Sequence, residues 1–108
     1  MINEDVLEAM KDTAILINVA RGALVDEEAL ISALAAEKIG GAALDVFEEE
    51  PLPASSPLWN LDNVIISPHV SGNSTMYHER AGVLFAENLQ RYVENRPLLN
   101  RFDREKGY

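Results

Sequence analysis

The apolar residues of this chain fall into two kinds of stretch, short unbroken runs and longer runs with helical spacing. The unbroken runs lie at residues 14–18, 42–44 and 64–66. An apolar run without alternation is typical of a strand that is covered on both faces of a parallel sheet. The sequence therefore predicts three such strands.

Helical spacing separates these runs. A first helix is predicted from Glu4 to Lys11, with Asn3 as its N-cap. A second helix is predicted to begin after Asp26 and to turn Leu30 and Leu34 toward the core. Its end is predicted at Lys38 and the Gly-Gly pair at 40–41. Strands that alternate with helices predict an α/β fold with a parallel sheet.

The remaining segments are a long loop, a last helix and a tail. Residues 46–60 contain three prolines and no periodicity, which is typical of a functional or disordered loop. Asn73 or Ser74 is predicted to cap a long helix that runs to about Glu94. We therefore divide the chain into a domain over residues 1–94 and a tail over residues 95–108. Three short strands make a poor sheet alone, so we expect either missing strand partners or self-association into a homo-oligomer.

Composition narrows the functional classes. The formal net charge of −9 disfavours binding to nucleic acid or to an anionic membrane. No apolar run is long enough to span a membrane, and the first residues lack the pattern of a secretory signal. The absence of cysteine fits a cytoplasmic protein, and two histidines without ligand spacing make a metal site improbable.

Each predicted strand is followed by a loop with one notable side chain, and ligands bind at the carboxyl ends of parallel strands. Arg21 follows the first strand and offers a planar fork for a carboxylate. Glu50 follows the second, where Pro51 restricts its backbone to an extended conformation. His69 follows the third and is the commonest kind of general acid or base.

Each of these residues also has a simpler interpretation. Alone, Arg21 is a surface arginine in a turn, the glutamates at 48–50 are a solvated run, and His69 is a structural histidine. Together they are the groups that reduction of a 2-oxo acid needs. An arginine binds the carboxylate, a histidine protonates the carbonyl oxygen while hydride arrives from a nicotinamide, and a glutamate orients the histidine.

Three stretches resemble signatures of the D-isomer-specific 2-hydroxyacid dehydrogenases. They read N-V-A-R-G-A-L-V-D-E-E-A-L at residues 18–30, G-A-A-L-D-V-F-E-E-E-P-L at 41–52 and S-P-H-V-S-G at 67–72. The stretch near Trp59 and the ending F-D-R-E-K-G-Y resemble the glyoxylate/hydroxypyruvate reductase A-like branch. The resemblance implies the C-terminal portion of a Rossmann-like NAD(P)-binding domain, followed by a long helix and a tail.

The resemblance also implies roles and a reaction. It makes Arg21 the substrate-binding arginine, His69 the proton donor and Glu50 its partner in the reduction of glyoxylate, hydroxypyruvate or a similar small 2-oxo acid. The cofactor is NAD or NADP. The residues that the resemblance places on its nicotinamide side are Val19, Ala20, Arg21, Asp45, His69 and Gly72.

One family feature is missing, because the chain contains no G-x-G-x-x-G turn. We therefore expect the 108 residues alone to have no appreciable activity and to correspond to the C-terminal third of such an enzyme. Two other classes stay open at this point. The first is a non-catalytic interaction module, as some corepressor relatives are. The second is an inactive fragment.

Overall fold

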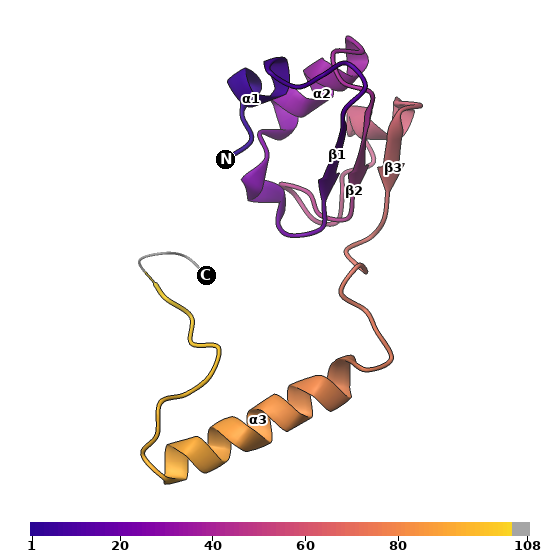
Figure 1. Ribbon diagram of the computed structural model, residues 1–108. Coiled ribbons are helices and arrows are strands. Elements are labelled where there is room, and N and C mark those ends of the chain that lie inside the picture. Colours follow the sequence, from indigo (N-terminus) through magenta and orange to yellow (C-terminus); the bar gives the residue numbers. More distant parts are fainter. Residues whose placement is uncertain (105–108) are drawn as a thin grey trace. The chain divides into compact units, whose positions relative to one another are not determined.

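The computed structural model describes residues 1–104 and contains the parallel sheet that the sequence predicts (Figure 1). Its strands are β1 (Ile15–Asn18), β2 (Gly41–Leu44) and β3 (Val64–Ile66), in the order β1-β2-β3. Both pairs are parallel, with Ile15 opposite Gly41 and Ala42 opposite Val64. All three carboxyl ends therefore lie at one edge of the sheet.

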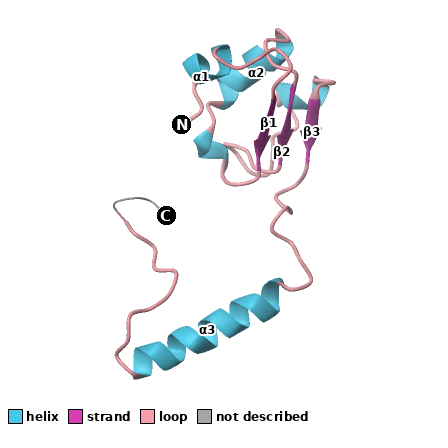
Figure 2. Ribbon diagram, in the orientation of Figure 1, coloured by secondary structure: helices cyan, strands magenta, loops and turns pink. Residues whose placement is uncertain are grey.

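Two helices cover one face of this sheet (Figure 2). They are α1 (Glu4–Glu8) and α2 (Glu27–Ala35). Leu30 and Leu34 of α2 are almost fully buried, as expected, and Leu7 of α1 packs in the same core. The predicted caps are confirmed as well, since the side chains of Asn3 and Asp26 accept hydrogen bonds from backbone N–H groups in the first turns.

The opposite face of the sheet is not covered within the first unit of the chain, so the expectation that β1 is covered on both faces is wrong. Leu16 and Asn18 are buried, whereas Ile17 is 69% exposed. On β3, Ile65 is 72% exposed. An unbroken apolar run therefore does not show that both faces of a strand are covered, nor which segment would cover them.

The predicted ends of α1 and α2 are wrong by a few residues, whereas the last helix ends at Val93, close to the expected Glu94. α1 ends at Glu8, not Lys11, because the N–H of Met10 donates to the carbonyl of Leu7, which tightens the last turn and lets the chain enter β1. α2 ends at Ala35, and Glu37 follows with a left-handed φ of 53°. The chain thus leaves α2 before the Gly-Gly pair that was expected to end it.

The segment over residues 46–60 is more ordered than its sequence suggests. It ends in a 3₁₀ turn over Pro57–Asn60, and the Ser56 hydroxyl accepts a hydrogen bond from the N–H of Leu58. The indole N–H of Trp59 donates to the carbonyl of Pro53 at 2.9 Å. This segment replaces a helix as the connection between β2 and β3.

The chain divides into two compact units, Met1–Ser71 and a second that begins at Gly72. The second unit contains α3 (Tyr77–Val93). The expected cap is wrong, because Met76 occupies the N-cap position and the Ser74 hydroxyl binds only the N–H of Met76, before the helix. After α3 the chain folds back, and the Asn88 side chain forms two hydrogen bonds with the backbone of Leu99.

The division that the sequence suggested, between residues 94 and 95, stays a prediction. Among residues 1–104, no helix is both long enough and apolar enough to cross a membrane.

Candidate active site

Arg21 is placed by a turn that Asn18 organises at the end of β1. The Asn18 side chain accepts a hydrogen bond from the N–H of Ala20 at 3.1 Å and donates one to the carbonyl of Arg21 at 2.9 Å. Asn18 is buried, so both of its polar ends are satisfied inside the protein. The guanidinium of Arg21 is exposed, and its Nη1 donates to the carbonyl of Ala20.

Glu50 is fixed by the backbone of its own loop. Its Oε1 accepts a hydrogen bond from the N–H of Phe47 at 3.0 Å. A second contact holds the same loop to α2, because the Glu27 carboxylate accepts from the N–H of Glu48. Glu50 therefore points in a defined direction, because its second oxygen is also bound, by His69, although Glu48, Glu49 and Glu50 are all exposed residues.

Gly22 allows the loops after β1 and β2 to approach each other. A Cβ at this position would lie 1.9 Å from the carbonyl oxygen of Phe47 and 2.6 Å from the backbone nitrogen of Glu48. The requirement for glycine here comes from this close approach.

We expect Gly22→Ala to lower the free energy of unfolding by about 1–3 kcal/mol, because the clash is with backbone and no side-chain rotation relieves it. Gly82→Ala is the matched control, since a Cβ there meets nothing within 4 Å. In α3 that change is expected to stabilise slightly, as alanine is a better helix former than glycine. Urea unfolding checks both variants, and a Gly22→Ala protein as stable as the unchanged chain would contradict the assignment.

His69 and Glu50 form the central contact of the site. The His69 Nδ1 lies 2.7 Å from the Glu50 Oε2, and both side chains are partly exposed. The hydrogen bond from His69 lowers the pKa of Glu50, and the Phe47 N–H and the charges of His69 and Arg21 act in the same direction against partial desolvation. Glu50 is therefore a carboxylate at neutral pH, and its bond with Nδ1 fixes the histidine tautomer.

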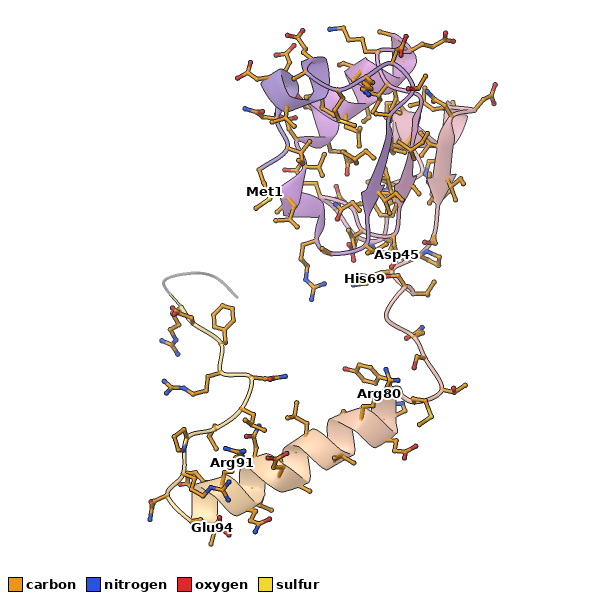
Figure 3. All side chains as sticks on the ribbon, in the orientation of Figure 1. Met1, Asp45, His69, Arg80, Arg91 and Glu94 are labelled. Atoms are coloured by element: carbon orange, nitrogen blue, oxygen red, sulfur yellow. The ribbon has the colours of Figure 1, made fainter. Side chains whose placement is uncertain are left out.

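The backbone of His69 is unusual. Its φ is 54°, in the left-handed region, which costs about 1–2 kcal/mol for a residue other than glycine. Asp45, directly after β2, lies near His69 (Figure 3) and binds the residues on either side of it. Asp45 is 2% exposed, and its carboxylate accepts hydrogen bonds from the Ser67 hydroxyl and from the N–H groups of Val70 and Ser71.

These bonds give Asp45 a pH dependence. Burial raises the pKa of its carboxyl, but the hydrogen bonds from Ser67, Ser71 and Val70 outweigh burial and hold the pKa well below its usual range. A folded-state pKa below the unfolded one means that the stabilisation is complete above the ordinary value of about 3.9 and is lost as pH falls from there.

We expect the stability of the chain to fall with pH below about 5, and Asp45→Asn to reduce that slope by up to about one proton. The variant is also expected to be less stable at neutral pH, because one of the three groups that donate to the Asp45 carboxylate would face an amide NH₂. Urea titrations at several pH values measure the slope. If Asp45→Asn kept the full acid dependence, the carboxylate would not be its source.

A cavity of about 680 Å³ adjoins the His69–Glu50 pair. Most of its lining is apolar, which suits the exclusion of water from a small ligand. The lining residues are Phe47, Glu50, Pro51, Leu52, Trp59, Ile66, Ser67, Pro68 and His69.

The structure thus brings Glu50 and His69 into contact and places Arg21 close enough for its charge to act on Glu50. Val19, at the end of β1, is 58% exposed, and Ala20 follows it. Gly72 belongs to the second unit. Within residues 1–104, no group of three histidine, aspartate or glutamate side chains has the arrangement of a metal site.

Sequence reasoning missed the residues that hold this trio in place. Asn18, Ser67 and Ser71 are polar residues at strand ends or beside His69, and that position was the available signal. Glu27 is an acidic residue in the first turn of α2. Its bond to the N–H of Glu48 spans 21 positions, and no local pattern reveals such a contact.

Comparison with known proteins agrees with this geometry. Residues 1–71 match the family described as D-isomer specific 2-hydroxyacid dehydrogenase, NAD binding domain. The chain belongs to this family. The fold is accordingly the C-terminal part of the family's NAD-binding, Rossmann-like domain, as the sequence predicted.

Individual relatives support the same family. A glyoxylate reductase of Thermofilum pendens is 52% identical over 89 residues, which cover 82% of this chain. A D-isomer specific 2-hydroxyacid dehydrogenase from Xanthobacter autotrophicus Py2, solved with NADPH and MES, has a TM-score of 0.89 at 44% identity over 97% of this chain. An NADPH-dependent glyoxylate/hydroxypyruvate reductase from Sinorhizobium meliloti, solved with NADP and sulfate, has a TM-score of 0.87 at 29% identity over 99%.

The chain is much shorter than these relatives. It spans 26% of the Thermofilum pendens protein, 43% of the Xanthobacter autotrophicus chain and 35% of the Sinorhizobium meliloti chain. The family assignment therefore concerns the segment that contains Arg21, Glu50 and His69.

Proposed function

We propose that this chain supplies the reaction centre for NAD(P)H-dependent reduction of a small 2-oxo acid to a D-2-hydroxy acid. The observation that carries the proposal is the 2.7 Å contact between the His69 Nδ1 and the Glu50 Oε2, at the sheet edge where Arg21 also lies. The names of the relatives support glyoxylate or hydroxypyruvate as the substrate.

Each residue of the trio has one task in this proposal. Arg21 binds the substrate carboxylate through its planar fork and polarises the adjacent carbonyl. His69 donates a proton to the carbonyl oxygen from Nε2, since its Nδ1 is bound to Glu50. Glu50 holds the tautomer and stabilises the charged form of the histidine before the proton leaves.

The nicotinamide cofactor, when bound, supplies the hydride that adds to the carbonyl carbon. We propose that Val19, Ala20, Arg21, Asp45, His69 and Gly72 lie on its nicotinamide side. The family's domain is described as NAD binding, and the two solved relatives hold NADPH and NADP, so both cofactors belong in a test.

Three further proposals concern the chain as a whole. We propose a cytoplasmic homo-oligomer. We also propose that the 108 residues alone do not turn over substrate, because they contain no G-x-G-x-x-G turn to bind a pyrophosphate. Domains of this class bind the pyrophosphate at such a turn, and without it the nicotinamide is not held against His69.

A chimera tests the function directly. This chain replaces the matching segment of the Thermofilum pendens glyoxylate reductase, and oxidation of NADH or NADPH by glyoxylate is followed at the nicotinamide absorbance band. We expect turnover of about 1 per second or more for the chimera and none for the 108 residues alone. A folded chimera that binds cofactor but reduces no 2-oxo acid would refute the proposed function. Turnover by the chain alone would refute only the inactivity.

A further inference from the structure

We propose that Asp45 is a positioning residue that sets the conformation of His69 through the backbone of the loop after β3. The inference rests on the proposed function, because His69 is a proton donor only in that reaction. The feature that carries it is the arrangement of hydrogen-bond donors around one buried carboxylate.

The donors come from both sides of His69. Ser67, two residues before it, donates its hydroxyl to the Asp45 Oδ1. The N–H of Val70 donates to the same oxygen at 2.9 Å, and the N–H of Ser71 donates to Oδ2 at 2.8 Å. Asp45 therefore holds the chain two residues before the histidine and directly after it.

These three hydrogen bonds to Asp45 explain how His69 keeps a left-handed backbone. Glu37, Asn95 and Asn100 also have positive φ values. Of these, Glu37 and Asn95 each follow a helix. There the N–H of the next residue donates to a helix carbonyl, Lys38 to Ala33 and Arg96 to Arg91.

His69 follows a strand, where no helix carbonyl is in reach. Successive N–H groups after a left-handed residue form a concave site for an anion. In this loop the anion is the carboxylate of Asp45, which takes the place of the helix carbonyls.

Asp45 is itself held firmly. Its N–H donates to the carbonyl of Asn18 at 3.0 Å, and the N–H of Ser67 donates to the carbonyl of Leu44. These bonds continue the sheet ladder past the strand ends. The histidine is thus fixed at two points, its ring by Glu50 and its backbone by Asp45, and both carboxylates come from the six residues after β2.

Solution NMR on the 108-residue chain, without cofactor, tests the inference. Asp45→Asn keeps the size of the side chain but turns an NH₂ toward one of the donors. The φ-dependent couplings of His69 and the ¹⁵N shifts of its ring nitrogens at alkaline pH report backbone and tautomer. We expect the unchanged chain to show a positive φ and a proton on Nδ1, and Asp45→Asn to show averaged couplings and mixed tautomers.

Asp26→Asn is the matched control. Asp26 is also an aspartate of the first unit that accepts a backbone hydrogen bond, from the N–H of Ala29, but it caps α2. Asparagine caps helices about as well as aspartate, so we expect this variant to fold with nearly the same stability and without any change in the His69 signals. In the chimera, Asp45→Asn is expected to lower kcat by about 10–100-fold and to leave KM for glyoxylate nearly unchanged.

His69 couplings and tautomer that stay the same in a folded Asp45→Asn chain would overturn the inference. If that variant does not fold, Ser67→Ala tests the inference in its place. It removes one donor and keeps both backbone bonds, so we expect a smaller shift of the same signals, and no shift would overturn the inference. These readouts need no turnover, so they stand apart from the outcome of the chimera assay.

Discussion

Replacing His69 with alanine in the chimera is expected to lower kcat by about 10²–10⁴-fold, with little change in KM for glyoxylate. The reason is that the alkoxide forming at the carbonyl oxygen loses its proton donor, while Arg21 still binds the substrate carboxylate. Glu50→Gln is expected to have a smaller effect, since glutamine keeps an oxygen for the N–H of Phe47 or for the Nδ1 of His69. Steady-state kinetics at saturating cofactor measure both.

His78→Ala is the control for this prediction. His78 is an exposed histidine near the start of α3, and its ring contacts the ring of Tyr77 edge-on. Its removal is expected to leave kcat unchanged. Equal kcat values in His69→Ala and His78→Ala would show that His69 does not transfer the proton.

Replacing Arg21 with alanine is expected to lower kcat/KM for glyoxylate by about 10²–10³-fold, mainly through KM. A charge-assisted hydrogen bond contributes about 1.5–3 kcal/mol, and a carboxylate accepts two from one guanidinium. Some loss in kcat is also expected, because the same group polarises the carbonyl. Arg21→Lys keeps the charge but loses the planar fork, so an intermediate value is expected.

The control is Arg80→Ala, an arginine of α3 that lies outside the first unit. We expect its kcat/KM to equal that of the unchanged chimera. Because Arg21 also lowers the pKa of Glu50, the pH dependence of kcat/KM is informative as well. An Arg21→Ala chimera with an unaltered KM for glyoxylate would remove Arg21 from the substrate site.

The sequence predicted the elements of the fold because their determinants are local. The apolar runs marked β1, β2 and β3, and Asp26 marked the start of α2. Helix ends were harder, since α1 and α2 stop where the chain must turn into the next strand. The exposure of Ile17 and Ile65 was not predictable, because apolar character does not identify the segment that covers a face.

The candidate site shows the same contrast between local residues, which the sequence indicates, and long-range contacts, which it does not. Strand ends and loop residues indicated Arg21, Glu50 and His69, and the parallel sheet brought their loops to one edge. Some contacts that fix them are local, such as Asn18 with Arg21. Others join residues 19 to 26 positions apart, such as Glu50 with His69 and Asp45 with Ser71. The approach of Gly22 to Phe47 is equally non-local.

Both carboxylates that hold the His69 loop lie within residues 45–50, and the segment at 51–60 follows them along the chain. An insertion or deletion inside those six residues would shift Glu50, which binds the ring of His69, relative to Asp45, which binds the backbone beside it. The segment at 51–60 lines the neighbouring cavity through Pro51, Leu52 and Trp59 but makes neither of these bonds. Changes in its length or side chains can therefore reshape the cavity without removing either bond. In the proposed reaction, it is the segment to vary when a different 2-oxo acid is to be accommodated.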